Sequence, residues 1–195
     1  GGSALASEEI WREVALTNKV KKVIVSMGDV AASGGYYIAT PADRIFAEST
    51  TITGSIGVFG MIPYTGKMFE NKLGITFDRV GTNSHSVLSL NKKLSPEELA
   101  RVQGEVDLIY DQFLMRVSDG RKLSKERVMQ IARGRVWTGK DALSIGLVDE
   151  LGSLQDAINY AVKTAVLTDP KIIYYPLIKE DKFAFLIDLI EEEAE

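Results

Sequence analysis

The stretch GDVAASGGYYIA, residues Gly28 to Ala39, is the part of the sequence that best indicates the fold. The run VKKVIVSM leads into it and predicts a short buried strand. The residues after Ser33 predict a helix, so Ser33 lies where a strand gives way to a helix. Gly34 and Gly35 follow it and allow close backbone approach. This placement is compatible with two roles for Ser33, a turn or N-cap residue and a nucleophile.

Composition excludes several functional classes. The chain has 195 residues, a formal net charge of −4, one histidine and no cysteine. An acidic balance argues against nucleic acid as the main partner, because phosphate binding needs a basic face. The absence of cysteine excludes a disulfide framework, a thiolate nucleophile and a cysteine-based metal site. No cluster of metal-ligand type and no P-loop sequence is present, so we expect no metal and no cofactor.

The hydrophobic pattern alternates strands with helices and predicts an α/β fold with a mainly parallel sheet. In the first helix, Leu5, Trp11, Val14 and Ala15 share the face expected to be buried. A second segment predicts a long helix that opens with a capping box of Ser95 and Glu98. The expected helices are 4–19, 65–74, 94–122, 124–133 and 181–195, and the expected strands are 20–27, 43–48, 75–80 and 171–177, with a β-rich stretch at 49–60. Residues 136–165 are expected to form a short strand, a helix, a glycine-containing turn and a second helix.

A nucleophilic serine needs three things. It should lie at a helix N-terminus, where backbone amides favour negative charge. The next residue should supply an N–H to an oxyanion, which Gly34 can do without steric obstruction. A base must lie within hydrogen-bond reach. The surrounding residues do not form the G-x-S-x-G motif, so an α/β-hydrolase elbow is not indicated.

Three separated motifs resemble a known peptidase family. The block VIVSMGDVAASGGYYIATPADRIFAESTTITGSIGVFG, the opening GGSALAS and the later RVWTGKDALSIGLVDELGSLQDAI are similar to the signatures of the signal peptide peptidase A-type serine peptidases of family S49. The resemblance runs from about Gly1 to Val166, and the tail after Asp169 matches more loosely. It implies an α/β ClpP/crotonase-like fold of repeated ββα units with additional C-terminal helices. It divides the chain into a peptidase domain, 1–168, and a C-terminal extension of a strand and an amphipathic helix, 169–195.

The same resemblance implies the active site. Ser33 matches the nucleophile of a Ser/Lys dyad, and the backbone N–H groups of Gly34 and Gly1 match the oxyanion hole. Gly57, Val58 and Phe59 match a segment that shapes the substrate groove in this family. The competing interpretation of that segment is a core strand with glycine bends. The implied substrates are cleaved signal peptides and other apolar peptides.

The lysine base is the part that the sequence does not supply. Short forms of the family carry it in the same domain, whereas tandem-domain forms take it from the N-terminal copy. Here the matching place reads RVGTNSHS, and Ser84 stands where the lysine would be. We therefore expect this chain to be the C-terminal half of a tandem form, inactive or nearly so by itself. The resemblance further implies a membrane-anchored parent protein with an extracytoplasmic, periplasmic catalytic domain and a ring-like or bowl-like homo-oligomer.

Several alternatives stay open. His85 could act as the base in place of a lysine, although a histidine base normally has an orienting carboxylate. Lys67, Lys92 and Lys93 are further candidates, but their polar surroundings predict exposure and a high pKa. The domain could also be a non-catalytic scaffold that binds apolar peptides, or a crotonase-type acyl-CoA enzyme with the same fold.

Overall fold

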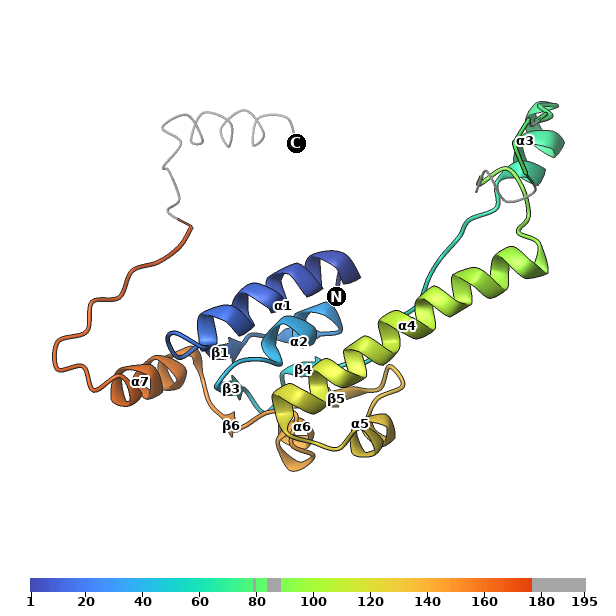
Figure 1. Ribbon diagram of the computed structural model, residues 1–195. Coiled ribbons are helices and arrows are strands. Elements are labelled where there is room, and N and C mark those ends of the chain that lie inside the picture. The colour runs from blue at the N-terminus through green and yellow to red at the C-terminus, as the bar shows by residue number, and fades with distance from the viewer. Residues whose placement is uncertain (79, 84–88, 177–195) are drawn as a thin grey trace, which may run out of the picture. The chain divides into compact units, whose positions relative to one another are not determined.

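The structure of the chain is a computed structural model, which describes residues 1–78, 80–83 and 89–176 (Figure 1). It divides into two compact units, residues 1–161 and residues 162–195. The elements follow one another in the order α1 (Ala4–Asn18), β1 (Ile24–Met27), β2 (Val30–Ala32), α2 (Gly34–Ala39), β3 (Arg44–Ala47), β4 (Ile52–Gly54), α3 (Gly66–Leu73), α4 (Pro96–Arg121), α5 (Lys125–Ile131), β5 (Val136–Thr138), α6 (Gly139–Ser144), β6 (Glu150–Leu151) and α7 (Leu154–Thr164).

Two successive strand–strand–helix units build the sheets around the Ser33 segment. One sheet has the strand order β1-β3-β6 and the other β2-β4-β5. All pairs are parallel except β4 with β5. Because β2 pairs in register with β4, Ala32 lies opposite Gly54, and the chain leaves both strands at the same edge. Ser33 stands at that edge, between β2 and α2.

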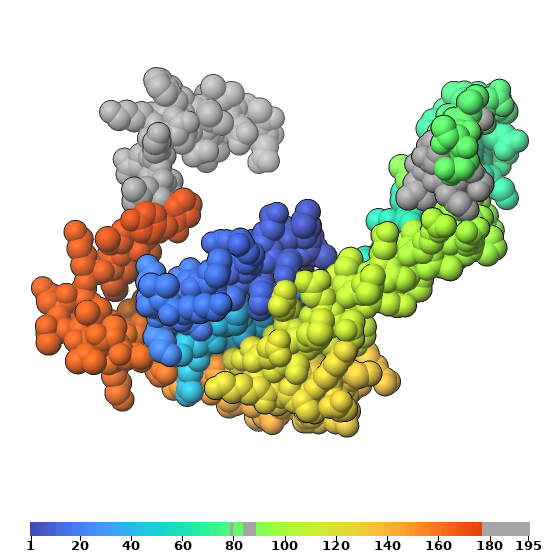
Figure 2. All heavy atoms as spheres, in the orientation of Figure 1, coloured from blue at the N-terminus to red at the C-terminus, as the bar shows by residue number. Residues whose placement is uncertain are grey.

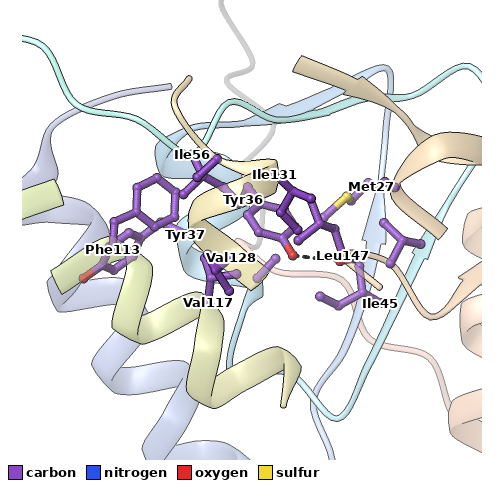
Figure 3. Packing of buried hydrophobic residues seen from close by; sticks show 14 of the residues in the cluster. Met27, Tyr36, Tyr37, Ile45, Ile56, Phe113, Val117, Val128, Ile131 and Leu147 are labelled. Carbon is purple, nitrogen blue, oxygen red and sulfur yellow. Dashed lines mark hydrogen bonds between the residues drawn. The ribbon is translucent and has the colours of Figure 1, made fainter. Parts of the chain in front are cut away.

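The core lies between the sheets and the helices α2, α4 and α5. Tyr36 of α2 is fully buried, and its hydroxyl donates a hydrogen bond of 2.9 Å to the carbonyl oxygen of Leu147 (Figure 3). Burial raises the pKa of Tyr36, so the hydroxyl stays protonated and keeps donating. Figure 3 shows Phe113 and Val117 of α4 in the same cluster. The helix that follows Ser33 is therefore anchored by its aromatic residues.

The long helix α4 begins as the sequence predicts. Ser95 accepts from the backbone N–H of Glu98 at 3.1 Å, and the carboxylate of Glu98 accepts from the backbone N–H of Ser95 at 2.7 Å. This reciprocal capping box satisfies two backbone donors that a helix start leaves open. Towards its other end, Gly120 passes so close to α2 that an added Cβ would lie 2.1 Å from the carbonyl oxygen of Thr40.

Two predicted strands are wrong over their described residues. In the segment 75–80 the described residues form no strand, and Phe77 packs edge to face on Phe69 of α3. The segment 171–176 is exposed and irregular, and Ile172, Ile173 and Tyr174 are half or more exposed. Both runs have the composition of strands, but none of the described strands pairs with them, and strand propensity depends on such packing. The tail helix predicted over 181–195 lies outside the described residues.

The β-rich stretch 49–60 is also shorter as a strand than predicted. Only Ile52–Gly54 form β4, and the two-residue strand β6, Glu150–Leu151, was not predicted. In the first helix, Leu5 is 71% exposed, so the expectation that it shares a buried face is wrong. None of the described helices is both long enough and apolar enough to cross a membrane.

Candidate active site

Ser33 has a backbone conformation that suits a glycine. Its φ of 53° and ψ of −119° correspond to the first central position of a type II′ turn. Residues other than glycine rarely adopt this backbone conformation. Two backbone hydrogen bonds, one from its N–H and one to its carbonyl oxygen, hold Ser33 in this conformation. Its N–H donates to the carbonyl of Gly54 at 2.9 Å, and its carbonyl accepts from the N–H of Tyr37 at 2.8 Å. Strained positions of this kind cluster at functional sites.

The hydroxyl of Ser33 does not serve the helix. Ser33 stands at the N-cap position of α2, but its side chain makes no capping hydrogen bond. By contrast, Ser3, Ser95 and Ser124 at other helix starts all accept a backbone N–H. The expectation that the Ser33 side chain caps the helix is therefore wrong, whereas its backbone does form a turn, as the other half of that interpretation has it.

Ser33 and Gly34 line a cavity of about 530 Å³ whose walls come from three parts of the first unit. One wall is the N-terminal half of α1, another the segment 57–60 and the third the middle of α4. Figure 2 shows the blue surface of α1 beside the yellow-green surface of α4. The apolar lining residues are Ala4, Leu5, Val58, Phe59, Val102, Val106, Ile109 and Phe113. A serine thus borders a largely apolar cavity.

The predicted groove residues Gly57, Val58 and Phe59 line this same cavity. The described chain leaves β4 at Gly54, so they do not continue a core strand. An added Cβ on Gly57 would lie 2.9 Å from the Cα of Gly134, so this backbone packs directly on the loop after α5. Phe59 is 90% exposed at the cavity. Their role in substrate binding stays a prediction.

The two predicted oxyanion donors meet at Ser33 from separate segments. An added Cβ on Gly1 would lie 3.6 Å from the Cβ of Ser33 and 3.9 Å from its Oγ. An added Cβ on Gly34 would lie 3.3 Å from the backbone nitrogen of Gly2 and 3.7 Å from the carbonyl carbon of Gly1. The start of the chain therefore lies against the first turn of α2. That their N–H groups hold an oxyanion stays a prediction.

A polar cluster that the sequence analysis missed lies beside the cavity, which two of its members, Glu8 and Tyr37, line. The hydroxyl of Tyr37 donates to Glu8, whose carboxylate also pairs with Arg116 of α4. The Arg116 guanidinium lies 3.6 Å from the ring centre of Trp11, and the Trp11 indole N–H donates to the hydroxyl of Thr40 at 3.0 Å. These contacts join α1, α2 and α4. The residues are far apart in sequence, so no local pattern identifies them.

The cluster shifts the pKa values of its members. Burial raises the pKa of Glu8, but hydrogen bonds from Arg116, Tyr37 and Gln112 and the positive charge of Arg116 together hold that pKa below its ordinary value. Burial, with the hydrogen bond to Glu8, raises the pKa of Tyr37 to about 12. At neutral pH the carboxylate is charged and already engaged. Glu8 is therefore a poor candidate for the base of Ser33.

None of the lysines in the described ranges lines the Ser33 cavity. Lys67 is exposed on α3, as predicted. Lys92 and Lys93 are exposed too and border a neighbouring cavity of about 510 Å³, where the ammonium of Lys92 lies 3.2 Å from the carboxylate of Glu98. Ser84 and His85 lie outside the described residues. The described part of the chain offers no group of three or more His, Cys, Asp or Glu residues that could hold a metal ion.

Comparison with known proteins gives a consistent result. The model of Peptidase family S49 matches residues 15–168. The chain is 44% identical over 176 residues to Protease 4 of Salmonella typhi, covering 90% of this chain and 28% of that protein. It is 41% identical over 167 residues to the chloroplastic serine protease SPPA of Arabidopsis thaliana, covering 85% and 24%. The chain thus spans about a quarter of the length of these relatives.

The fold also recurs in a solved structure. The 1510-N membrane-bound stomatin-specific protease matches with a TM-score of 0.50 at 14% sequence identity, over 83% of this chain and 64% of that one. Likeness at this identity concerns the fold alone. Together with the repeated ββα units, it confirms the predicted α/β ClpP/crotonase-like fold.

Proposed function

This chain belongs to peptidase family S49, and we propose that Ser33 is the nucleophile of a serine endopeptidase of the Ser/Lys type. The observation that carries the proposal is the backbone conformation and side-chain bonding of Ser33. A residue held at positive φ, at a helix start, with a hydroxyl that does not cap the helix, borders a cavity large enough for side chains of a peptide.

The proposed chemistry follows from this placement. The Oγ of Ser33 attacks the scissile carbonyl carbon, and its proton passes to the base. The carbonyl oxygen becomes an oxyanion, which the N–H groups of Gly34 and Gly1 stabilise. The base then protonates the leaving amine as the carbon–nitrogen bond breaks, and water hydrolyses the acyl-enzyme.

The base is proposed to be a lysine from a domain outside this sequence. A lysine base must lose its proton near pH 7, so burial has to lower its pKa by roughly 3 units from about 10.4. The exposed side chains of Lys67, Lys92 and Lys93 do not meet that condition. The relatives' greater length is consistent with a second domain that could supply it.

The proposed substrates are apolar peptides, including the remnants of cleaved signal peptides. The cavity beside Ser33 has mostly apolar walls, which suits the apolar central region of a signal peptide. We further propose that the parent protein is membrane-anchored with this domain on the extracytoplasmic side, and that copies assemble into a ring-like or bowl-like oligomer. These finer statements rest on the family resemblance.

The test uses the full-length protein that carries this domain. Ser33→Ala should abolish cleavage of an apolar fluorogenic peptide and labelling by a fluorophosphonate probe. Ser144→Ala is a matched control, because Ser144 is exposed on α6 and its hydroxyl donates to a backbone carbonyl away from the cavity. Turnover by the Ser33→Ala protein would contradict the assignment of Ser33 as the nucleophile. A wild-type protein that neither cleaves nor labels would instead identify a non-catalytic scaffold.

A second arm concerns the base. The isolated 195-residue chain should have little or no activity, and adding the separate upstream domain should restore it. Full activity of the isolated chain would place the base within this sequence, at His85 or a local lysine, and would overturn the proposal of a base supplied by another domain.

A further inference from the structure

Ser7 is buried in α1 although the helix carries larger apolar residues. It is 8% exposed, whereas Leu5, Ile10 and Leu16 are 71%, 48% and 42% exposed. A helix that packs on a core normally buries its apolar side chains. A serine in the buried position indicates that the neighbouring backbone comes too close for a larger residue.

That neighbour is Gly34. A Cβ added to Gly34 would lie 2.6 Å from the Oγ of Ser7, closer than real side chains approach one another. The hydroxyl of Ser7 therefore occupies the space beside Gly34 where any other residue would carry a side chain. Ser7 and Gly34 both line the Ser33 cavity.

Ser7 is also fixed to the start of its own helix. Its hydroxyl donates to the carbonyl of Ser3 at 2.8 Å, and its backbone N–H donates to the same oxygen at 3.0 Å. Ser3 in turn caps the helix by accepting from the N–H of Ala6. The first turn of α1 is therefore held in place, and with it the preceding glycines.

We propose that Ser7 is a positioning residue that sets the spacing between Gly1 and Gly34 around Ser33. The Oγ of Ser7 fills the space beside Gly34 and also donates to the carbonyl oxygen of Ser3, two residues after Gly1. The proposal rests on the proposed function, in which the N–H groups of these two glycines hold the oxyanion. An oxyanion hole works when its donors are already in place before charge develops.

The first experiment tests whether Ser7 affects stabilisation of the transition state, as distinct from folding. In the full-length protein, Ser7→Ala should lower kcat about tenfold with little change in KM, less than the 10²–10³-fold loss typical of removing a donor outright. A peptide aldehyde supplies a second readout, because Ser33 adds across its carbonyl and the new oxygen occupies the oxyanion position. Ser7→Ala should weaken the aldehyde severalfold more than the matching peptide alcohol, which forms no such adduct. Ser144→Ala should change neither.

The second experiment tests the close approach of Ser7 Oγ to Gly34. Gly34→Ala should lower kcat by about 100-fold or more, because its Cβ collides with the Oγ of Ser7. Gly34→Ala combined with Ser7→Ala removes the colliding oxygen. The double variant should therefore recover at least about tenfold over Gly34→Ala, although Ser7→Ala is harmful in the wild-type background.

The outcomes separate this inference from the proposed function. Cleavage by a Ser33→Ala protein would overturn the function and the inference together. An inactive Ser33→Ala protein, with wild-type kcat and an unchanged aldehyde-to-alcohol ratio in Ser7→Ala, would overturn only the role of Ser7. Gly34→Ala and the double variant having equal activity would also overturn it. Melting temperatures of all variants should accompany the kinetics.

Discussion

The hydroxyl of Tyr37 donates a hydrogen bond of 2.5 Å to the carboxylate of Glu8, and this bond joins α2 to α1 next to Ser33. Tyr37 is buried, and Glu8 also pairs with Arg116 of α4. The helix that begins at Ser33 is thus fixed to both helices that wall the cavity. The stability of this cluster and the geometry of the site should be coupled.

Removing the Tyr37 hydroxyl should destabilise the fold. A hydrogen bond to a charged group contributes about 1.5–3 kcal/mol, so Tyr37→Phe should lower the free energy of unfolding by about that amount. The measurement is urea denaturation of the isolated chain. In a double-mutant cycle, Tyr37→Phe should cost less in a Glu8→Gln background. Strictly additive effects would show that the two side chains do not interact in solution.

The pH dependence of the free energy of unfolding should show the contribution of the Glu8 carboxylate. Burial raises its pKa, but hydrogen bonds from Arg116, Tyr37 and Gln112 and the charge of Arg116 together lower the pKa in the folded chain. The stabilisation is therefore fully present above the ordinary glutamate pKa near 4.5 and is lost as pH falls through the lower folded value. Unfolding free energies of the wild type and Glu8→Gln should differ most at about pH 6–7, and the difference should shrink as the pH falls below the ordinary glutamate pKa near 4.5. A difference that is constant over this range would contradict the assignment.

Two glycines of α4 should respond oppositely to alanine. An added Cβ on Gly120 would lie 2.1 Å from the carbonyl oxygen of Thr40, whereas nothing lies within 4 Å of one on Gly104. Gly120→Ala should destabilise by about 1–3 kcal/mol through overpacking. Gly104→Ala should stabilise by about 1 kcal/mol, because alanine is the better helix former. Thermal and urea unfolding of both variants would check this, and equal effects would contradict the close packing of α4 on α2.

The local sequence predicts the elements near Ser33 well, since each has its own signal. The strand predicted at 20–27 appears as β1, Ile24–Met27, and the helix after Ser33 appears as α2, whereas the short strand β2 directly before Ser33 was not predicted. Further along the chain, the Ser95–Glu98 capping box also appears as predicted. The strands expected at 75–80 and 171–177 fail over their described residues because strand formation needs a partner strand, which composition does not reveal.

Some residues of the candidate site could be predicted from the sequence, and others could not. The flanking motifs identify Ser33 and Gly34, but Ser7 and Glu8 become visible only when α1 packs on α2. The apolar residues Ala4 and Trp11, one helical turn before and after Ser7, were a local signal for its position on the packed face. Contacts such as Glu8 with Arg116 span more than a hundred residues and have no local signature.

The strained backbone of Ser33 predicts an unusual order of stabilities. Its φ of 53° and ψ of −119° suit glycine, and such a conformation costs other residues about 1–3 kcal/mol. Ser33→Gly and Ser33→Ala both remove the hydroxyl and should both be inactive, but only glycine relieves the strain. Glycine also costs about 0.5–1 kcal/mol through the entropy of the unfolded chain. Ser33→Gly should therefore be the more stable variant by about 1 kcal/mol in urea denaturation.

Ser144 in α6 supplies the control for this comparison, because its helical backbone favours alanine over glycine. There the order should reverse, with Ser144→Ala more stable than Ser144→Gly. If alanine is also the more stable residue at position 33, the backbone is not strained there, and the main structural argument for Ser33 as nucleophile is lost. If glycine is favoured at position 33 alone, the fold maintains an unfavourable conformation at the residue proposed to attack the substrate. That is the expected result where stability is given up for reactivity.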